Sequence, residues 1–248
     1  MRPVDVAIDQ TLNFLYRILP APPLRILEVG CGSGDLAKRL LREGFEVTAL
    51  DSSPEAVRVA RAAGVPAVEA DFLGYNNDPY DVVLFVRSLH HVRSLSEAML
   101  RAAALLHAKG WLIAEEFARE RANRETAAWF YDNRELLKVS GVLTHAHDAP
   151  KSDASDSTFD PLERWRVDHQ GDPGHPLHDR NAMLAEIGRR FEIIDSQDAP
   201  YLYRYLSQWI EESPRGCDLA HRLLEIETRR IAQMLLAPIG FRVVAKKR

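Results

Sequence analysis

The sequence predicts a doubly wound α/β fold built on a seven-stranded, mostly parallel sheet. Short apolar runs, typical of buried parallel strands, alternate with helical patterns over the first 117 residues. The first run, residues 24–29, leads into a turn with glycines on alternate positions and then into a helix. The run Y-D-V-V-L-F-V at 80–86 is apolar on both faces, as a central strand covered by helices on both sides requires.

The glycine turn predicts a ligand site. Gly30, Gly32 and Gly34 let the chain bend sharply and leave no side chain between the backbone and a ligand. The helix that follows offers free N–H groups and a partial positive charge. Asp35 stands where the dinucleotide fingerprint G-x-G-x-x-G needs its third glycine, which argues against a nicotinamide cofactor. The alternative is an ordinary tight turn between strand and helix.

Two acidic residues downstream favour the ligand site. Asp51 follows the second expected strand, residues 46–50, at the edge where open α/β sheets bind ligands. A carboxylate there can accept both hydroxyl hydrogens of a ribose. Ser53 and Pro54 already supply the start of the next helix, so Asp51 is not needed for that purpose. Asp71 and Phe72 follow the third expected strand, residues 66–70.

The pattern E-x-G-x-G-x-G from Glu28, together with the order of these later motifs, resembles the first motif of the class I S-adenosylmethionine (SAM)-dependent methyltransferases. The resemblance implies a Rossmann-like methyltransferase fold with SAM as methyl donor and S-adenosylhomocysteine (SAH) as product. It implies that Glu28 helps hold the methionine amino group, and that Asp71 accepts from the adenine amino group while Phe72 flanks the ring. The cofactor-binding residues that we expect are Glu28, Gly30, Cys31, Gly32, Gly34, Asp51, Ser52, Asp71, Phe72, Arg87 and Ser88.

An L-H-H turn at 89–91 follows the central strand and is similar to the turn beside the sulfonium in many small-molecule methyltransferases. We expect one histidine to pack or hydrogen-bond and the other to line the substrate pocket. Glu115 and Glu116 end the fifth expected strand, residues 111–117, and strand alternation sends them to opposite faces. The catalytic candidates are His91, Glu116 and His169, with His145 and His178 as further candidates for a general base.

The remaining pattern predicts the other elements. Apolar spacing indicates helices over 4–19, over 121–139, over 181–189 and over 219–236, and a helix that Ser94 caps with Glu97 and Gly110 ends. Residues 191–196 and 240–245 read as strands six and seven. The expected cofactor-binding core is therefore 1–118, 190–198 and 239–248.

The insertions 119–189 and 199–238 are far longer than crossover helices, and we expect them to form a substrate cap or a dimer surface. The direction of their aromatic side chains distinguishes a substrate cap from a dimer surface. These side chains are Trp129, Trp165, Tyr201, Tyr203 and Tyr205. A segment rich in histidine lies within the first insertion, but no pair has the helical H-x-x-x-H spacing, so we expect no metal. The members of that segment are His145, His147, Asp148, His169, His175 and His178.

Composition narrows the function. The net charge of −4 and a pI near 6.1, without a basic stripe, disfavour a nucleic-acid substrate. Cys31 and Cys217 make no disulfide framework, and the N-terminus has no signal-peptide pattern, so we expect a cytoplasmic protein that does not contact membranes. The expected reaction is methyl transfer to an oxygen or nitrogen of a small molecule. The alternatives are a protein that binds SAM or SAH without methyl transfer and, less favoured, an NAD-dependent oxidoreductase.

Overall fold

The computed structural model of the 248-residue chain describes residues 1–144, 160–172 and 175–248. The chain divides into two compact units. The first, here called the sheet unit, comprises Thr11–Glu116, His178–Gln197 and Arg242–Arg248. The second, the helical unit, comprises Met1–Gln10, Phe117–Leu177 and Asp198–Phe241.

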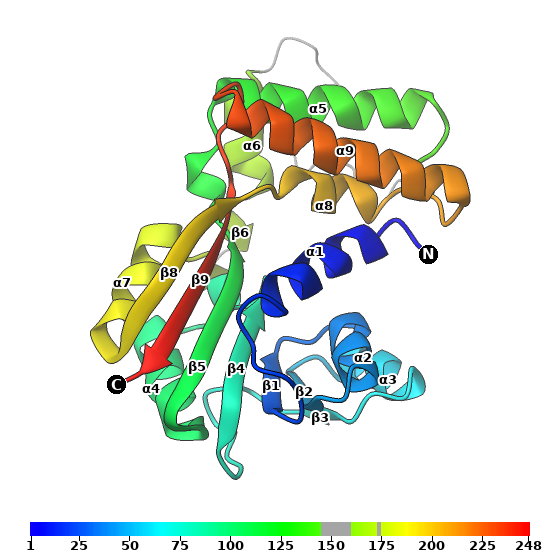
Figure 1. Ribbon diagram of the computed structural model, residues 1–248. Coiled ribbons are helices and arrows are strands. Elements are labelled where there is room, and N and C mark those ends of the chain that lie inside the picture. Colours follow the sequence, from blue (N-terminus) through cyan, green and yellow to red (C-terminus); the bar gives the residue numbers. More distant parts are fainter. Residues whose placement is uncertain (145–159, 173–174) are drawn as a thin grey trace. The chain divides into compact units, whose positions relative to one another are not determined.

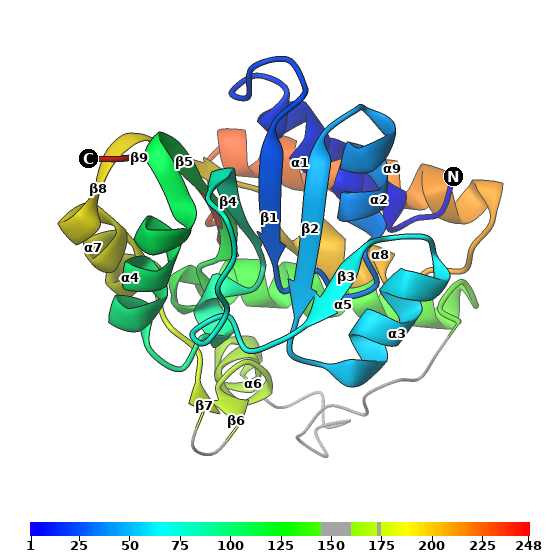
Figure 2. The same cartoon turned by 90° about the horizontal axis from the view of Figure 1, so that it is seen from below.

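A seven-stranded sheet in the order β3-β2-β1-β4-β5-β9-β8 confirms the predicted fold class (Figure 2). The strands are β1 Arg25–Val29, β2 Glu46–Asp51, β3 Ala67–Glu69, β4 Tyr80–Val86, β5 Leu106–Phe117, β8 Phe191–Ala199 and β9 Gly240–Lys247. β1 to β5 pair in parallel, and β9 runs in the opposite direction (Figure 1). The strand order reverses between β1 and β4, and ligands of such sheets bind at the carboxyl ends of the strands flanking that reversal.

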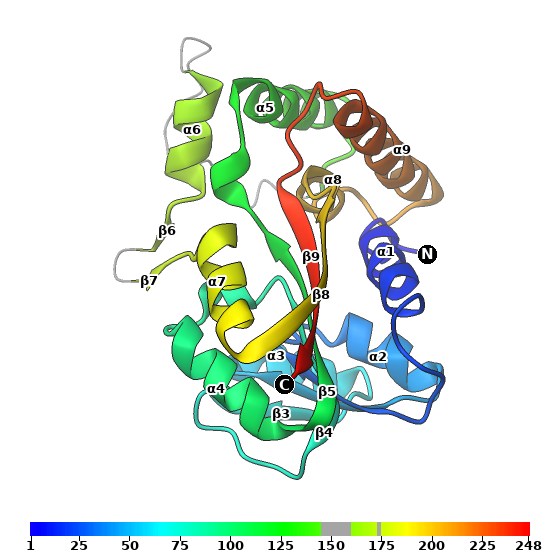
Figure 3. The ribbon, with the colours of Figure 1, turned by 60° about the vertical axis from the view of Figure 1, so that its left-hand side comes forward.

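Helices cover both sides of the sheet. α2 Asp35–Arg42 and α3 Pro54–Ala62 pack against β2 and β3, while α4 Leu95–Leu105 packs against β4 and against α7 Arg180–Arg190. Figure 3 shows α4 and α7 on one side of the sheet and α2 on the other. Ser53 caps α3 and Ser94 caps α4 through their side-chain oxygens, as the sequence predicts.

The prediction that Gly110 ends α4 is wrong. α4 ends at Leu105 and β5 begins at once with Leu106, so Gly110 lies inside the strand. The β4–β5 register shifts between Tyr80 and Val82, and Lys109 has a φ of 64°. A Cβ on Gly110 would lie 3.2 Å from the carbonyl oxygen of Asp81. The glycine therefore permits an irregular strand pairing rather than a helix end.

The helical unit contains α5 Arg124–Val139, α6 Pro161–Asp168, α8 Leu202–Ser207 and α9 Pro214–Ala232, together with the two-residue strands β6 Gly171–Asp172 and β7 His175–Pro176. The helix α1 Asp5–Leu15 begins in this unit and continues into the sheet unit. α5 packs against α6, and α8 packs against α9.

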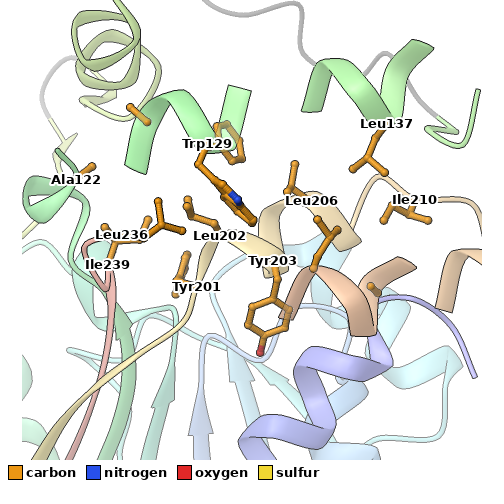
Figure 4. Close-up of a cluster of buried hydrophobic side chains, with 14 of the residues drawn as sticks. Ala122, Trp129, Leu137, Tyr201, Leu202, Tyr203, Leu206, Ile210, Leu236 and Ile239 are labelled. Atoms are coloured by element: carbon orange, nitrogen blue, oxygen red, sulfur yellow. The ribbon is translucent and has the colours of Figure 1, made fainter. Parts of the chain in front are cut away.

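The aromatic residues of the insertions form the hydrophobic core of the helical unit (Figure 4). Trp129, Trp165, Tyr201 and Tyr203 are buried, and Tyr205 packs against them partly exposed. Within this core the rings of Tyr201 and Tyr205 lie with their centroids 5.5 Å apart, and the Trp165 ring lies 6.0 Å from that of Phe117. The predicted division into a core and a cap or dimer surface stays a prediction.

A buried carboxylate on α9 fixes the start of α8. The side chain of Tyr201, the N-cap residue, does not cap α8. Glu227 accepts instead from the backbone N–H groups of Tyr201, Leu202 and Tyr203 at 2.7, 2.9 and 2.8 Å. Burial raises the Glu227 pKa to about 7 in spite of these hydrogen bonds.

Candidate functional site

The glycine turn after β1 divides into a packed side and an open side. A Cβ on Gly30 would lie 2.5 Å from the Cβ of Ser88, and one on Gly34 would lie 3.0 Å from the Cβ of Ala60. No atom of the described residues lies within 4 Å of a Cβ built on Gly32, whose φ is +54°. Gly30 and Gly34 are therefore required by packing, whereas Gly32 faces open space at the edge where ligands of this fold bind.

Asp51 links the glycine turn to the end of β2. Its Oδ2 accepts from the N–H of Gly32 at 2.8 Å, and its Oδ1 accepts from the N–H of Ser53 at 2.9 Å. The side chain remains partly exposed. A carboxylate oxygen can accept more than one hydrogen bond, so Asp51 can hold the turn and still accept from two hydroxyl groups. Ser52 lies beside it and is exposed.

Glu28 is the unusual group of the site. It lies in β1, is 3% exposed, and its Oε2 has no hydrogen-bond partner among the described residues. Burial raises the pKa of this carboxyl to about 8, against the lowering effect of the Ala37 N–H, with Asp35 and Asp51 raising it further. A buried carboxyl with an unpartnered oxygen is costly, and a cationic ligand group would relieve that cost.

Cys31 is a packing residue of the turn. Its side chain is buried, and burial raises the pKa of the thiol to about 12. The thiol therefore stays protonated at neutral pH, so Cys31 can contribute to a cofactor site through its backbone and its shape.

Asp71 and Phe72 follow β3, and the first side chain is exposed whereas the second is buried. Asp71 is exposed, accepts from the N–H of Leu73 at 2.9 Å and forms an ion pair with Arg93. Phe72 is buried and packs edge-on against Phe85, with ring centroids 5.3 Å apart. The carboxylate is accessible to a ligand, while the Phe72 ring also contributes to the core.

The segment after β4 is held in an uncommon conformation. Arg87 has a φ of 58°, and its N–H donates to the carbonyl oxygen of Glu115 at 2.8 Å. Ser88 donates through its hydroxyl to the carbonyl oxygen of Val29 at 2.5 Å, which fastens this segment to β1. A non-glycine residue with positive φ is costly and persists where its surroundings impose it, often at functional sites.

Glu116 on β5 binds the residues that follow Arg87. Its Oε1 accepts from the N–H groups of Ser88 and Leu89 at 2.9 and 2.6 Å, and His90 Nδ1 lies 2.5 Å from its Oε2. Burial acts to raise the Glu116 pKa, but the His90 ring and the two N–H groups together hold it below its usual value. Both oxygens of this carboxylate are thus engaged with the L-H-H turn. Glu115 on the opposite face binds Thr11 and Arg242 instead, as alternation predicts.

The two histidines of the turn differ. His90 is buried against Glu116, whereas His91 is exposed, with the two rings 4.1 Å apart. His178 packs against the same turn, its N–H donating to the carbonyl oxygen of His90 at 3.0 Å. His178 Nε2 lies 2.8 Å from the carbonyl oxygen of Val92. The structure therefore gathers three histidines and Glu116 at the end of β4.

His169 belongs to the helical unit. Its ring stacks on Trp165 with centroids 3.7 Å apart, and burial lowers its pKa to about 4. A neutral imidazole of this kind is a weak base at pH 7. His145, the remaining candidate base, lies outside the described residues, as do His147 and Asp148.

Sequence reasoning missed two contacts of the site. The ion pair of Arg93 with Asp71 joins residues 22 positions apart, and His178 contacts Val92, just after the L-H-H turn, from 86 positions away. The sequence holds no signal for either contact, because both depend on how the crossover segments return to the sheet. Only the structure shows that His90 is buried and His91 exposed.

The residues of this site fit the cofactor that the resemblance implies. The unpartnered oxygen of Glu28 matches an ammonium group, and the open side of the turn at Gly32 leaves room for a ligand. The exposed Asp71 matches a donor such as an adenine amino group. Within the described ranges, no three His, Cys, Asp or Glu side chains gather as metal ligands would, and no helix is long and apolar enough to cross a membrane.

Comparison with known proteins identifies the family. Residues 4–147 match a family model described as a methyltransferase domain. The chain is 30% identical over 202 residues to a ubiquinone biosynthesis O-methyltransferase of Methylocella silvestris, covering 71% of this chain and 75% of that protein. It is 30% identical over 131 residues to the protein of the same name from Xylella fastidiosa, covering 49% of this chain and 53% of that one. The chain thus spans about half the length of this relative.

Solved structures agree on the fold. A SAM-dependent methyltransferase from Mesorhizobium loti superposes with a TM-score of 0.61 at 18% identity, covering 98% of this chain and all of that one. At this identity the likeness concerns the fold alone.

Proposed function

Because the chain belongs to the class I SAM-dependent methyltransferase family, we propose that it transfers a methyl group to an oxygen or nitrogen of a small molecule. SAM is the methyl donor of this family and SAH its product. The observation that carries the proposal is that the Oε2 of buried Glu28, beside the glycine turn, has no hydrogen-bond partner among the residues that the structure describes. A structural carboxylate would be expected to have its own partners, as Glu116 has.

The proposed cofactor contacts follow from the chemistry of each group. Glu28 holds the amino group, and the backbone of the turn from Gly30 to Gly34 lies along the methionine end. Asp51 accepts hydrogen bonds from the two ribose hydroxyls and retains those that it accepts from the N–H groups of Gly32 and Ser53. Asp71 accepts from the adenine amino group. The other expected contacts are those of Cys31, Ser52, Phe72, Arg87 and Ser88.

The bound cofactor supplies a methyl group on a sulfonium, a good leaving centre for in-line displacement. The protein's contribution is alignment of the acceptor and removal of its proton. Among the three catalytic candidates, exposure favours His91 as the base. The carboxylate of Glu116 is engaged by Ser88, Leu89 and His90, which supports a positioning role for it. The low pKa of His169 makes it a weak acceptor of a proton.

A small-molecule acceptor is supported by the net charge of −4, which disfavours a nucleic-acid substrate. An oxygen acceptor is supported by the names of the relatives from Methylocella silvestris and Xylella fastidiosa. A homodimer remains a proposal, and the helical unit is where its surface would be sought.

The test has two stages. Calorimetric titration with SAH is expected to show micromolar binding, and NADH is expected not to bind. A panel of phenols and amines is then incubated with SAM, and SAH formation is measured. His91→Asn is expected to lower kcat about 100-fold or more while leaving SAH affinity unchanged, as loss of a general base does. His107→Asn, an exposed histidine of β5, is the matched control.

Failure of SAH to bind would contradict the proposal. SAH binding without turnover of any acceptor would instead favour the second candidate, a protein that binds SAM or SAH without methyl transfer. Full activity of the His91 variant would exclude His91 as the base and leave the cofactor site standing.

A further inference from the structure

The helical unit contains a pocket of about 200 Å³, and none of its lining residues is among the expected cofactor contacts. It lies where the 3-10 helix Arg119–Arg121, here η2, meets α6. Ala122, Leu162 and Trp165 give it an apolar wall. Ligand pockets for drug-sized molecules run from about 300 to 1,000 Å³, so this one suits a smaller compound of about one ring.

Two arginines supply positive charge to this pocket. Arg119 and Arg166 both line it, and Glu120 is the acidic residue among its lining groups. Burial keeps His169, also in the lining, at a pKa of about 4, so it adds a flat neutral surface rather than a charge at pH 7. The charges of the lining therefore sum to +1, which favours an anion.

Arg119 is set up to donate hydrogen bonds. One of its terminal nitrogens donates to the carbonyl oxygen of Leu177 at 2.9 Å, whereas its buried Nε has no partner among the described residues. The carbonyl oxygen of Arg119 accepts from Trp165 Nε1 at 3.0 Å, which ties the arginine backbone to the pocket wall. A buried unsatisfied donor is costly and is relieved by an acceptor such as a carboxylate.

Arg166 is more loosely held. It pairs with Glu163 one turn earlier on α6, and its side chain is 63% exposed. An ion pair this exposed contributes little to stability, so Arg166 can turn toward an anion at small cost. Guanidinium groups bind carboxylates through two parallel hydrogen bonds, which a lysine does not reproduce.

We propose that this pocket is a binding site for a small organic anion, a carboxylate carried on a single ring, held by Arg119 and Arg166 against the wall of Trp165 and His169. The site goes beyond the proposed methyl transfer, because binding in it requires neither SAM nor turnover.

The experiment titrates 4-fluorobenzoate into the 248-residue chain and follows the fluorine NMR signal, with 4-fluorobenzamide as the uncharged probe of the same shape. Saturable binding of the carboxylate at millimolar or lower concentration is expected, with the amide at least about tenfold weaker, because the charge-assisted hydrogen bonds are lost. Arg119→Gln is expected to weaken carboxylate binding about tenfold or more, and Arg119→Lys by an intermediate factor.

Arg166→Gln tests the proposal without touching a buried group, and a loss of about three- to tenfold is expected. Arg222→Gln on α9 is its matched control, because Arg222 is also exposed and paired with a glutamate three residues away. Absence of carboxylate binding, equal binding of the amide, or equal losses in the Arg166 and Arg222 variants would each overturn the proposal. SAH is titrated into the same samples, so that failure of the cofactor site is recognised separately.

Discussion

Glu28 and Glu116 are two buried glutamates of the same sheet with opposite surroundings. Glu116 is fully buried, yet two backbone N–H groups and His90 hold its pKa below the usual value. Glu28 is nearly as buried, but its Oε2 has no partner in the described part of the chain and its pKa rises to about 8. Both carboxyl groups are thus buried, and their different hydrogen-bond and charge partners determine whether each pKa is raised or lowered. The contrast supports a structural role for Glu116 and the cofactor-binding role that we propose for Glu28.

The largest effect is expected for Glu116→Ala. This change leaves the N–H groups of Ser88 and Leu89 and the His90 ring without their acceptor, and breaking a buried charged network in this way costs about 3–5 kcal/mol of unfolding free energy. Urea unfolding measures the loss, with Glu69→Ala, an exposed carboxylate at the end of β3, as control. A loss below about 1 kcal/mol would contradict the structural role of Glu116.

Asp51→Ala is expected to weaken SAH binding by about 1.5–3 kcal/mol, because the lost carboxylate would accept from the ribose hydroxyls. Calorimetry measures the affinity. Glu55→Ala, on the exposed ion pair with Arg58, is expected to bind SAH as the wild type does. Equal affinity in the Asp51 and Glu55 variants would remove Asp51 from the cofactor site.

The two glutamates are expected to give pH dependences of opposite sign. The folded-state pKa of Glu28 is raised, so its contribution to stability is lost as pH rises from about 4.5 toward 8, by up to about 1.4 kcal/mol per pH unit. Glu28→Gln should therefore gain stability relative to the wild type over that range. The Glu116 pKa is lowered, so its contribution is present above the usual carboxyl pKa and is lost as pH falls through its folded value.

Unfolding curves of wild type, Glu28→Gln and Glu116→Gln at a series of pH values test whether the two stability differences from wild type change in opposite directions with pH. The cost of Glu116→Gln should shrink as the solution becomes acidic. If both differences changed in the same direction with pH, the assignment of one glutamate to structure and the other to a ligand would be wrong.

The smallest effect on stability is expected within the glycine turn. The methyl group of Gly32→Ala meets no atom of the described residues within 4 Å, so the change should cost about 1 kcal/mol of stability for the positive φ. SAH binding should weaken, because the new methyl group occupies the open side of the turn. Gly30→Ala should cost more stability, since its Cβ would lie 2.5 Å from that of Ser88. Thermal unfolding and SAH titration of both variants separate the two roles, and an opposite order of stability would contradict them.

Much of the fold followed from the sequence because its signals are local. The glycines set the turn, Ser53 and Ser94 cap their helices, and β4 spans the predicted residues. The early start of β5 was missed because Gly110 reads as a helix end, and its strand role depends on the pairing with Asp81 and its neighbours.

The candidate site was predictable as a set of residues but not as a set of roles. Alternation separated Glu115 from Glu116, yet it could not reveal that Glu116 binds the L-H-H turn. No pattern distinguishes Glu28, with an unpartnered oxygen, from Glu116, with two engaged oxygens. These roles depend on contacts between strands, which are distant in the sequence.

The most direct test of the account is the number of protons released when SAH binds. Calorimetric titrations at pH 7 in buffers of different ionisation enthalpy measure this number. Because burial raises the Glu28 pKa to about 8, SAH binding is expected to release a large fraction of one proton as the carboxyl ionises against the amino group. Almost no release is expected from Glu28→Gln, with an unchanged value for Glu55→Gln. Binding of SAH without proton release, or equal release from wild type and Glu28→Gln, would contradict the assignment of Glu28 to the cofactor.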